Sequence, residues 1–175
     1  DVAQVISRVR EEAGRKPSAR GTVRASAQVP RHPITERPNP RDPTLWPQRE
    51  ALKSALQYPA LAGPVFDSLP ADSFTHPGYL AVRTAIEAAG GTSAGLTGAQ
   101  WMEQVREHAG TPAVAGLVSE LSVETIKVED EERLPRYIGG VLARLQEVWV
   151  GRQVAEVKSK LQRRSPVDQG DEYHA

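Results

Sequence analysis

The chain has 175 residues, 22 basic and 22 acidic side chains, and no cysteine. This length allows one or two small domains with a real hydrophobic core. The balanced charge excludes a uniformly basic nucleic-acid module, although not a local basic patch. Without cysteine, the chain can hold no disulfide framework, thiol nucleophile, cysteine-ligated zinc finger or iron–sulfur site, which agrees with a reducing compartment such as the cytoplasm.

No stretch approaches the roughly 18 consecutive apolar residues of a membrane-spanning helix, so we expect no membrane contact. Residues 1–12 are charged and lack the apolar core of a signal peptide. Both ends of the sequence suggest a piece of a larger protein. Apolar residues at positions 2, 5, 6 and 9 predict a short helix over 1–13, either the last helix of an upstream domain or one that packs on the downstream domain.

Residues 14–42 predict a semi-extended Pro/Arg-rich linker. Seven prolines fall between Pro17 and Pro47, and segment 14–41 has seven basic residues against one acidic residue. Its few, small apolar side chains cannot offset the entropy cost of ordering the segment. We therefore expect the linker to be mobile and dispensable for folding. Because the total charge is zero, the remainder of the chain is acidic.

Residues 43–149 show the caps and stops of helices, and no sustained alternation typical of strands. Asp42 and Pro43 predict the start of a first helix that ends near Tyr58, and a short helix follows at 60–68. Further predicted helices start at His76 and Pro77, at a capping box over 97–100, at Thr111 and Pro112, and at about residue 134. The predicted fold class is all-α: a bundle of about five short helices followed by a long helix over 134–163.

The predicted core consists of the apolar residues that recur on the inward face of each helix. These are Leu52, Leu56, Ile86, Trp101, Leu117, Leu121, Ile138, Leu142 and Leu145. All three tryptophans, Trp46, Trp101 and Trp149, fall on apolar faces, so we expect them to pack in the core; a base-stacking platform is the alternative.

The long helix changes its apolar face part-way along. A first stripe runs from Leu134 to Trp149, and a second stripe follows at Val150, Val154, Val157 and Leu161. The two stripes lie roughly 150° apart on a helical wheel of 100° per residue. We therefore expect the second stripe to be exposed or covered by a partner. A kink near Gly151 that returns it to the bundle is the alternative.

Residues 150–175 predict the start of a C-terminal helical hairpin. The chain turns at Ser165 and Pro166, and a returning helix would begin near Asp171. That helix would be truncated here, which leaves the second stripe open to self-association through 150–165 or to a partner.

No catalytic constellation is visible. The four histidines are far apart, and no phosphate-binding or nucleophile motif occurs. The acidic run 129–132 lacks the alternating oxygen ligands of a calcium loop, so we interpret it as solvated loop rather than a cation site. The residues alone thus indicate a non-catalytic helical interaction module without a cofactor.

Three motifs together resemble the C-terminal helicase-binding domain of bacterial DNA primases. Residues 43–61 read PTLWPQREALKSALQYPAL, a helix that ends in a Leu-x-x-Pro-x-Leu-like segment. Residues 74–79 read FTHPGY and open a later helix, and the long helix carries Arg144-Leu145 and the pattern of Val154, Val157 and Leu161. The resemblance covers about 42–175 and rests on the order and spacing of these motifs.

This resemblance implies a helical bundle plus hairpin that docks primase on the N-terminal domains of the hexameric replicative helicase and couples primer synthesis to unwinding. Residues 1–13 would then end the RNA-polymerase domain, and zinc and magnesium would belong to upstream domains only. Some family members also bind the acidic tail of single-strand-binding protein, for which Arg49 and Lys53 would be the matching exposed cations. A nucleic-acid-binding module that acts through the basic linker remains an alternative; a small enzyme has no supporting motif.

Overall fold

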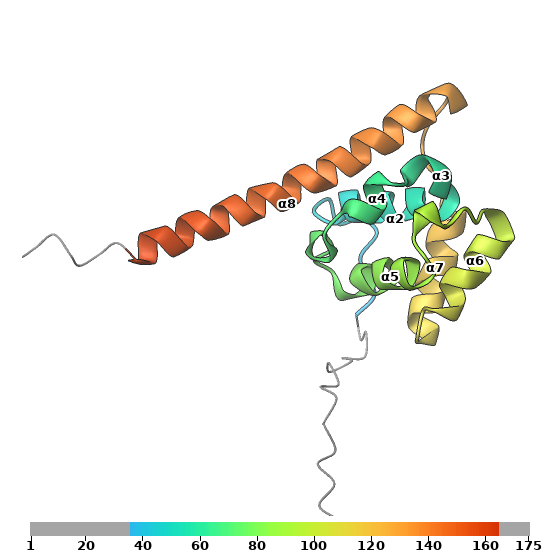
Figure 1. Ribbon diagram of the computed structural model, residues 1–175, viewed down its shortest axis with the longest axis horizontal. Helices are drawn as coiled ribbons and strands as arrows, with labels where there is room; N and C mark the ends of the chain where they lie inside the picture. Colours follow the sequence, from blue (N-terminus) through green and yellow to red (C-terminus); the bar gives the residue numbers. More distant parts are fainter. Residues whose placement is uncertain (1–35, 165–175) are drawn as a thin grey trace, which may run out of the picture. The chain divides into compact units, whose positions relative to one another are not determined.

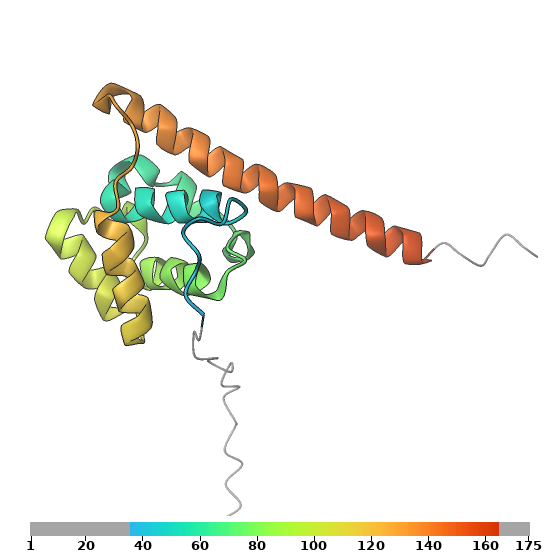
Figure 2. The ribbon, with the colours of Figure 1, turned by 180° about the vertical axis from the view of Figure 1, so that it is seen from behind.

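A computed structural model describes residues 36–164, which contain seven α-helices and no strand (Figures 1 and 2). The predictions for 1–13, for most of the linker and for a returning helix near Asp171 lie outside these residues. The helices are α2 (Trp46–Gln57), α3 (Pro59–Ala62), α4 (Val65–Ser68), α5 (Pro77–Ala88), α6 (Gly98–Glu107), α7 (Pro112–Val123) and α8 (Leu134–Arg164). Short 3₁₀ turns lie at η1 (Ala71–Ser73), η2 (Thr92–Ala94) and η3 (Glu131–Arg133).

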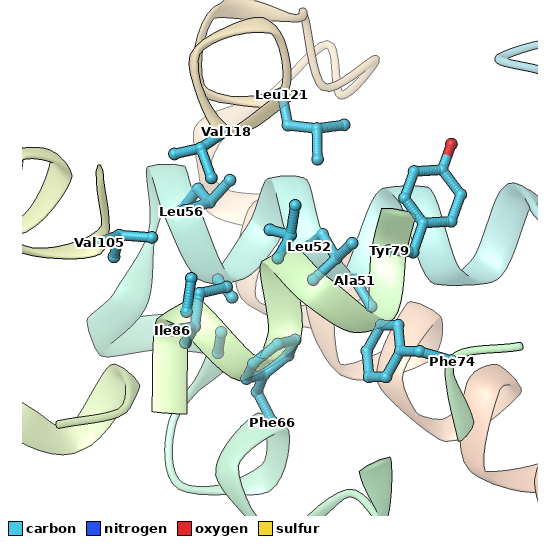
Figure 3. Packing of buried hydrophobic residues seen from close by; sticks show 14 of the residues in the cluster. Ala51, Leu52, Leu56, Phe66, Phe74, Tyr79, Ile86, Val105, Val118 and Leu121 are labelled. Carbon is cyan, nitrogen blue, oxygen red and sulfur yellow. The ribbon is translucent and has the colours of Figure 1, made fainter. Parts of the chain in front are cut away.

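Helix α2 is the centre of the bundle, because α3, α5, α6, α7 and α8 all contact it. Its residues 47–56 are therefore all buried, polar ones included. Figure 3 shows side chains from α5 and α7 around Leu52 and Leu56. The Trp101 indole also donates a hydrogen bond of 3.2 Å to the carbonyl of Ala55. All nine predicted core residues are buried, so that prediction is confirmed.

The predicted capping residues can be compared with the observed N-termini of the helices. His76 Nδ1 accepts from the amide of Gly78 at 3.0 Å, and Thr111 Oγ1 accepts from Val114, so the predicted starts of α5 and α7 are confirmed. Thr97 makes no capping hydrogen bond, so the predicted capping box is wrong. Asp42 does not cap α2 either, because its carboxylate accepts from Thr44 at 2.8 Å in a local turn, and the helix begins four residues later.

The last residues of the predicted linker pack on the bundle. Pro38 is buried, and Gly78 of α5 lies so close that an added Cβ would approach the Pro38 ring to 3.2 Å. Arg37 pairs with Glu120 of α7. The expectation of a mobile segment is therefore wrong for these residues, because Pro38 packs against Gly78 of α5 and Arg37 pairs with Glu120 of α7. That the linker is dispensable for folding stays a prediction.

Helix α8 is one continuous helix that agrees with the predicted 134–163. Its buried side chains end at Leu145, while Val148 is exposed and Trp149 is partly buried. The core prediction for Trp149 is wrong, because its indole donates to Asp72 at the surface instead of packing in the core. Helix geometry continues through Gly151, so the alternative of a returning kink is not seen. The core prediction for Trp46 is wrong: it is 44% exposed, because it is the first residue of α2 and precedes the enclosed stretch. None of the helices in residues 36–164 is long and apolar enough to cross a membrane.

Candidate protein-docking site

The distal stripe of α8, defined as Val150, Val154, Val157 and Leu161, faces solvent. The exposed fractions of these four residues are 44%, 47%, 55% and 62%. The predicted exposure is thus confirmed within the described residues. The physical origin of this exposure is that α8 continues past the end of the bundle (Figure 1), so every residue from 154 to 164 is exposed whichever face of the helix carries it.

The stripe offers contact area and no reactive group. Its spacing of 4, 3 and 4 residues places four aliphatic side chains in one row on a helix. Such a row fits a partner helix or an apolar groove. Four of the eight intervening positions are charged, and one of these residues, Lys160, pairs with Glu156 at 2.7 Å within the helix itself. The distal half of α8 is therefore an amphipathic surface with its apolar side uncovered among the described residues.

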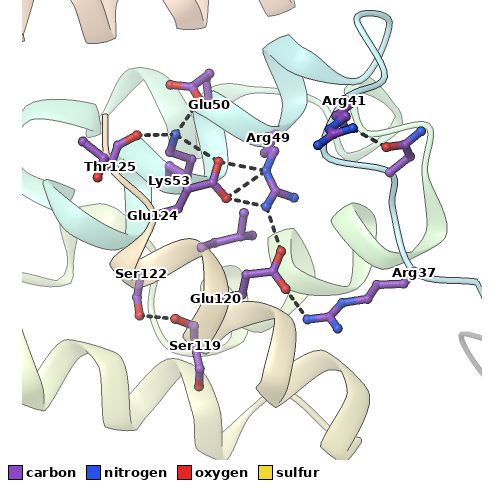
Figure 4. Close-up of polar contacts among 12 residues, drawn as sticks. Arg37, Arg41, Arg49, Glu50, Lys53, Ser119, Glu120, Ser122, Glu124 and Thr125 are labelled. Carbon is purple, nitrogen blue, oxygen red and sulfur yellow. Dashed lines mark hydrogen bonds and ion pairs between the residues drawn. The ribbon is translucent and has the colours of Figure 1, made fainter. Parts of the chain in front are cut away.

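The predicted cations Arg49 and Lys53 are not exposed, so that part of the prediction is wrong. They are only 4% and 2% exposed. Arg49 donates to the Tyr79 hydroxyl at 2.9 Å and to Glu120 at 2.8 Å, and it also pairs with Glu124 (Figure 4). The guanidinium is thus held by α5 and α7 rather than presented to solvent.

Lys53 lies in the same network. Its Nζ donates to Glu50 at 2.6 Å and to the carbonyl of Thr125 at 2.9 Å, and it lies 3.4 Å from Glu124. Glu50 also accepts from the Tyr137 hydroxyl of α8 at 2.7 Å. The network therefore connects α2 to α5, α7 and α8 through buried charged groups whose partners are all supplied by the bundle.

The pKa values follow from these contacts. Burial disfavours the charged form of Arg49, but the hydrogen bonds to Glu124, Tyr79 and Glu120 outweigh it and raise its pKa. The hydrogen bond from Arg49 lowers the pKa of Glu120 below its ordinary value. Burial works against ionisation of Glu124, yet Arg49 and Lys53 lower its pKa as well. Arg49 and its two carboxylate partners are thus stabilised in their charged forms.

The described residues contain no group of three or more His, Asp or Glu side chains placed to hold a metal ion. Apart from the charge network, the features that stand out in residues 36–164 are contact surfaces.

Comparison with known proteins gives the family. The profile of the family described as DNA primase DnaG DnaB-binding matches residues 48–175. The chain belongs to this family. The match extends over most of the bundle and all of α8.

The curated relatives are similar over most or all of this chain. It is 72% identical over 178 residues to the DNA primase of Mycolicibacterium smegmatis, covering 100% of this chain and 28% of that protein. The DNA primase of Streptomyces coelicolor is 36% identical over 166 residues, with 91% and 24% covered. The chain thus spans less than a third of the length of these relatives.

A solved structure, the helicase binding domain of primase from Mycobacterium tuberculosis, is 71% identical to this chain. It superimposes with a TM-score of 0.62 and covers 74% of this chain and 80% of that chain. This likeness supports the all-α fold described above.

Several residues of the charge network and of the α8 contacts could not be predicted from the sequence. Glu120 and Glu124 neutralise Arg49, and they stand 71 and 75 residues away from it in the chain. Glu120 lies on α7 and Glu124 caps its C-terminus, but no local signal showed that α2 would lie against them. Asp72 of η1 was also missed; it accepts a hydrogen bond of 2.8 Å from the indole of Trp149.

Proposed function

We propose that this chain docks a DNA primase on the hexameric replicative helicase and so couples primer synthesis to DNA unwinding, without catalysing a reaction itself. The observation that carries the proposal is the distal stripe of α8, four exposed aliphatic residues in one row. Membership of the DnaB-binding family and the likeness to the helicase binding domain of the M. tuberculosis primase support helicase as the partner.

The stripe is large enough to anchor an interface. From Val150 to Leu161 the helix rises about 16 Å, at 1.5 Å per residue. Each fully buried aliphatic side chain contributes about 1.5–3 kcal/mol of transfer free energy. A groove in the helicase N-terminal domains that also receives the returning helix expected near Asp171 would reach the roughly 800 Å² per partner of an ordinary interface.

The decisive test places charge on the stripe. Val154→Asp combined with Leu161→Asp should abolish co-elution with the helicase on size-exclusion chromatography, because two carboxylates cannot enter an apolar groove unpaired. The matched control, Ser159→Asp with Gln162→Asp, adds the same charge to exposed positions off the stripe and should bind as the parent chain does.

Both double variants should keep the helical circular-dichroism signal and the melting temperature, since no buried side chain changes. Co-elution of the stripe variant would place docking elsewhere on the bundle. Unfolding of the stripe variant alone would show that the stripe belongs to the core.

The other proposed contacts are weaker. Binding of an acidic single-strand-binding-protein tail at Arg49 and Lys53 stays a prediction, and the burial of both cations speaks against it. Titration of a tail peptide at low salt against the parent chain and Arg49→Glu tests it; equal binding excludes Arg49. Nucleic-acid binding through the basic linker would instead fall steeply with salt, and self-association through 150–165 would appear in sedimentation.

We further propose that this part of a primase needs no cofactor, with zinc and magnesium confined to upstream domains, and that it works in the cytoplasm. Refolding in the presence of a chelator tests the first point: full recovery of helicity is expected.

A further inference from the structure

The contacts between α8 and the bundle end in two steps: apolar packing ends first, and hydrogen bonds end further along the helix. Its last buried side chain is Leu145, and the distal stripe begins five residues later. Around the start of the stripe, three residues of α8 donate hydrogen bonds to η1: Trp149, Arg152 and Gln153. Among the described residues, α8 makes no hydrogen bond or ion pair to the bundle beyond Gln153.

All three contacts converge on one residue, Asp72. The Trp149 indole donates to one carboxylate oxygen at 2.8 Å, and the Gln153 amide donates to the other at 3.3 Å. Arg152 donates to the backbone carbonyl of Asp72. An ionised acceptor gives stronger hydrogen bonds than a neutral one. We call this set of contacts the Asp72 clamp.

The clamp rests on a rigid base. Asp72 is itself exposed, but its neighbours Ser73 and Phe74 are each only 2% exposed. The Phe74 ring packs against Phe66 with centroids 6.0 Å apart, and the Ser73 amide donates to Pro70 at 2.9 Å. Asp72 therefore offers fixed acceptors to α8 rather than following it.

The clamp also sets the direction in which the distal stripe faces. Residues 149, 152 and 153 share one helix face, and the mean direction of the stripe lies about 115° around the helix from that face. Contacts at i, i+3 and i+4 resist both tilt and rotation of the helix about its axis. Without them, the last fixed point would move from Gln153 back to Leu145, and the unsupported length to Leu161 would grow from about 12 Å to about 24 Å.

We propose that Asp72 is a positioning residue for docking: it holds α8 at Trp149, Arg152 and Gln153 and thereby fixes the orientation of the distal stripe. This role rests on the proposed docking function. The clamp reduces the freedom that the helix would lose on binding, and preorganisation of this kind raises affinity.

The experiment measures orientation and affinity separately. Because the chain has no cysteine, Glu103→Cys on α6 and Lys158→Cys on α8 can carry a pair of spin labels without a background. Electron–electron resonance should give a narrow distance distribution for this labelled parent chain and a distribution at least twice as wide after Asp72→Ala. Glu156→Ala removes a polar contact that lies within α8 alone, so this control should keep the parent width.

A second variant changes the hydrogen-bond donor on α8 instead of the acceptor on η1. Trp149→Phe removes the indole donor and should also widen the distribution. Adding it to Asp72→Ala should widen the distribution no further, because both changes break the same contact. Melting temperatures should stay within a few degrees of the parent, since Asp72 is exposed; should Asp72→Ala fail to fold, Trp149→Phe carries the test.

Helicase affinity is then measured with the unlabelled variants. Asp72→Ala should weaken binding about tenfold, while Glu156→Ala should leave it unchanged. An unchanged distance distribution in Asp72→Ala overturns the clamp, and a wider distribution with parental affinity overturns its role in docking. If the stripe variant Val154→Asp with Leu161→Asp still binds helicase, the proposed function fails instead, and the distance measurement alone then decides whether Asp72 holds α8.

Discussion

From Leu134 to Leu145, α8 buries five side chains in the bundle, whereas from Val150 to Leu161 it exposes four aliphatic side chains in a row. Both halves are equally helical and comparably rich in apolar residues. They differ in the face that carries the apolar residues and also in their surroundings, because α8 runs past the bundle and every residue from 154 to 164 is exposed. The comparison teaches that a regular helix with an apolar stripe need not belong to the core of its own domain.

The two halves also differ in their polar contacts. Tyr137 in the first half donates to the buried Glu50, a member of the Arg49 network. Among the described residues, the hydrogen bonds from the second half to the bundle are those of the exposed Asp72 clamp. The first half is therefore fixed by packing and buried charge, and the second by a few surface hydrogen bonds. This contrast leads to four predictions, in order of decreasing effect.

The largest difference should appear between matched truncations in the two halves. Leu142→Ala should lower the free energy of unfolding by about 2–5 kcal/mol, because Leu142 is 1% exposed and its removal leaves a cavity. Val154→Ala should change it by about 0.5 kcal/mol or less, as expected of an exposed site. Urea unfolding followed by circular dichroism measures both. A near-neutral Leu142→Ala would break the comparison.

The buried charge network should matter next. Arg49→Ala should cost about 1.5–3 kcal/mol, the range for hydrogen bonds to charged groups, because Tyr79, Glu120 and Glu124 lose their common partner. Arg144→Ala is the control: it removes an exposed arginine that pairs only with Glu147 of the same helix, and it should be almost neutral. Equal costs would mean that the network contributes nothing specific.

The end of the linker should contribute less. Removal of residues 1–41 should lower the free energy of unfolding by about 1 kcal/mol, because the buried Pro38 loses its apolar contacts. Removal of 1–35 keeps that contact and serves as the comparison; it should leave the melting temperature unchanged. If both truncations melt alike, the segment that precedes α2 packs without stabilising the bundle.

The smallest effect should be on how the free energy of unfolding depends on pH in the acid range. The folded-state pKa values of Glu120 and Glu124 lie below the ordinary value of 4.5. Their contribution is therefore fully present above that value and is lost as the pH falls through the lower folded pKa values. When the free energy of unfolding is measured from pH 7 to pH 3, it should fall less steeply with decreasing pH in Arg49→Ala than in the parent chain. An identical slope would assign the acid sensitivity to other carboxylates.

Local patterns were sufficient for much of this protein. The spacing of apolar residues at a period of 3.6 predicted the nine core positions and the extent of α8, because helix formation and the side on which residues lie depend on neighbours within one or two turns. The same geometry predicted the exposed distal stripe. Pro77 and Pro112 marked helix starts because proline suits the first turn of a helix.

Contacts between distant segments could not be predicted in this way. Arg49 and Lys53 look like solvated cations on α2, and only the packing of α7 brings Glu120 and Glu124 to them. In the sequence, Pro38 looks like part of the linker, and only the fold brings it against Gly78 of α5. Nothing in the sequence around Asp72 indicates its role, because its contacts arise only where α8 passes η1. The sequence by itself determined which residues form helices and which helix faces are apolar, since both depend on short-range geometry. Only the tertiary structure decided which charges are neutralised and where α8 is held, because those depend on groups brought together from positions tens of residues apart.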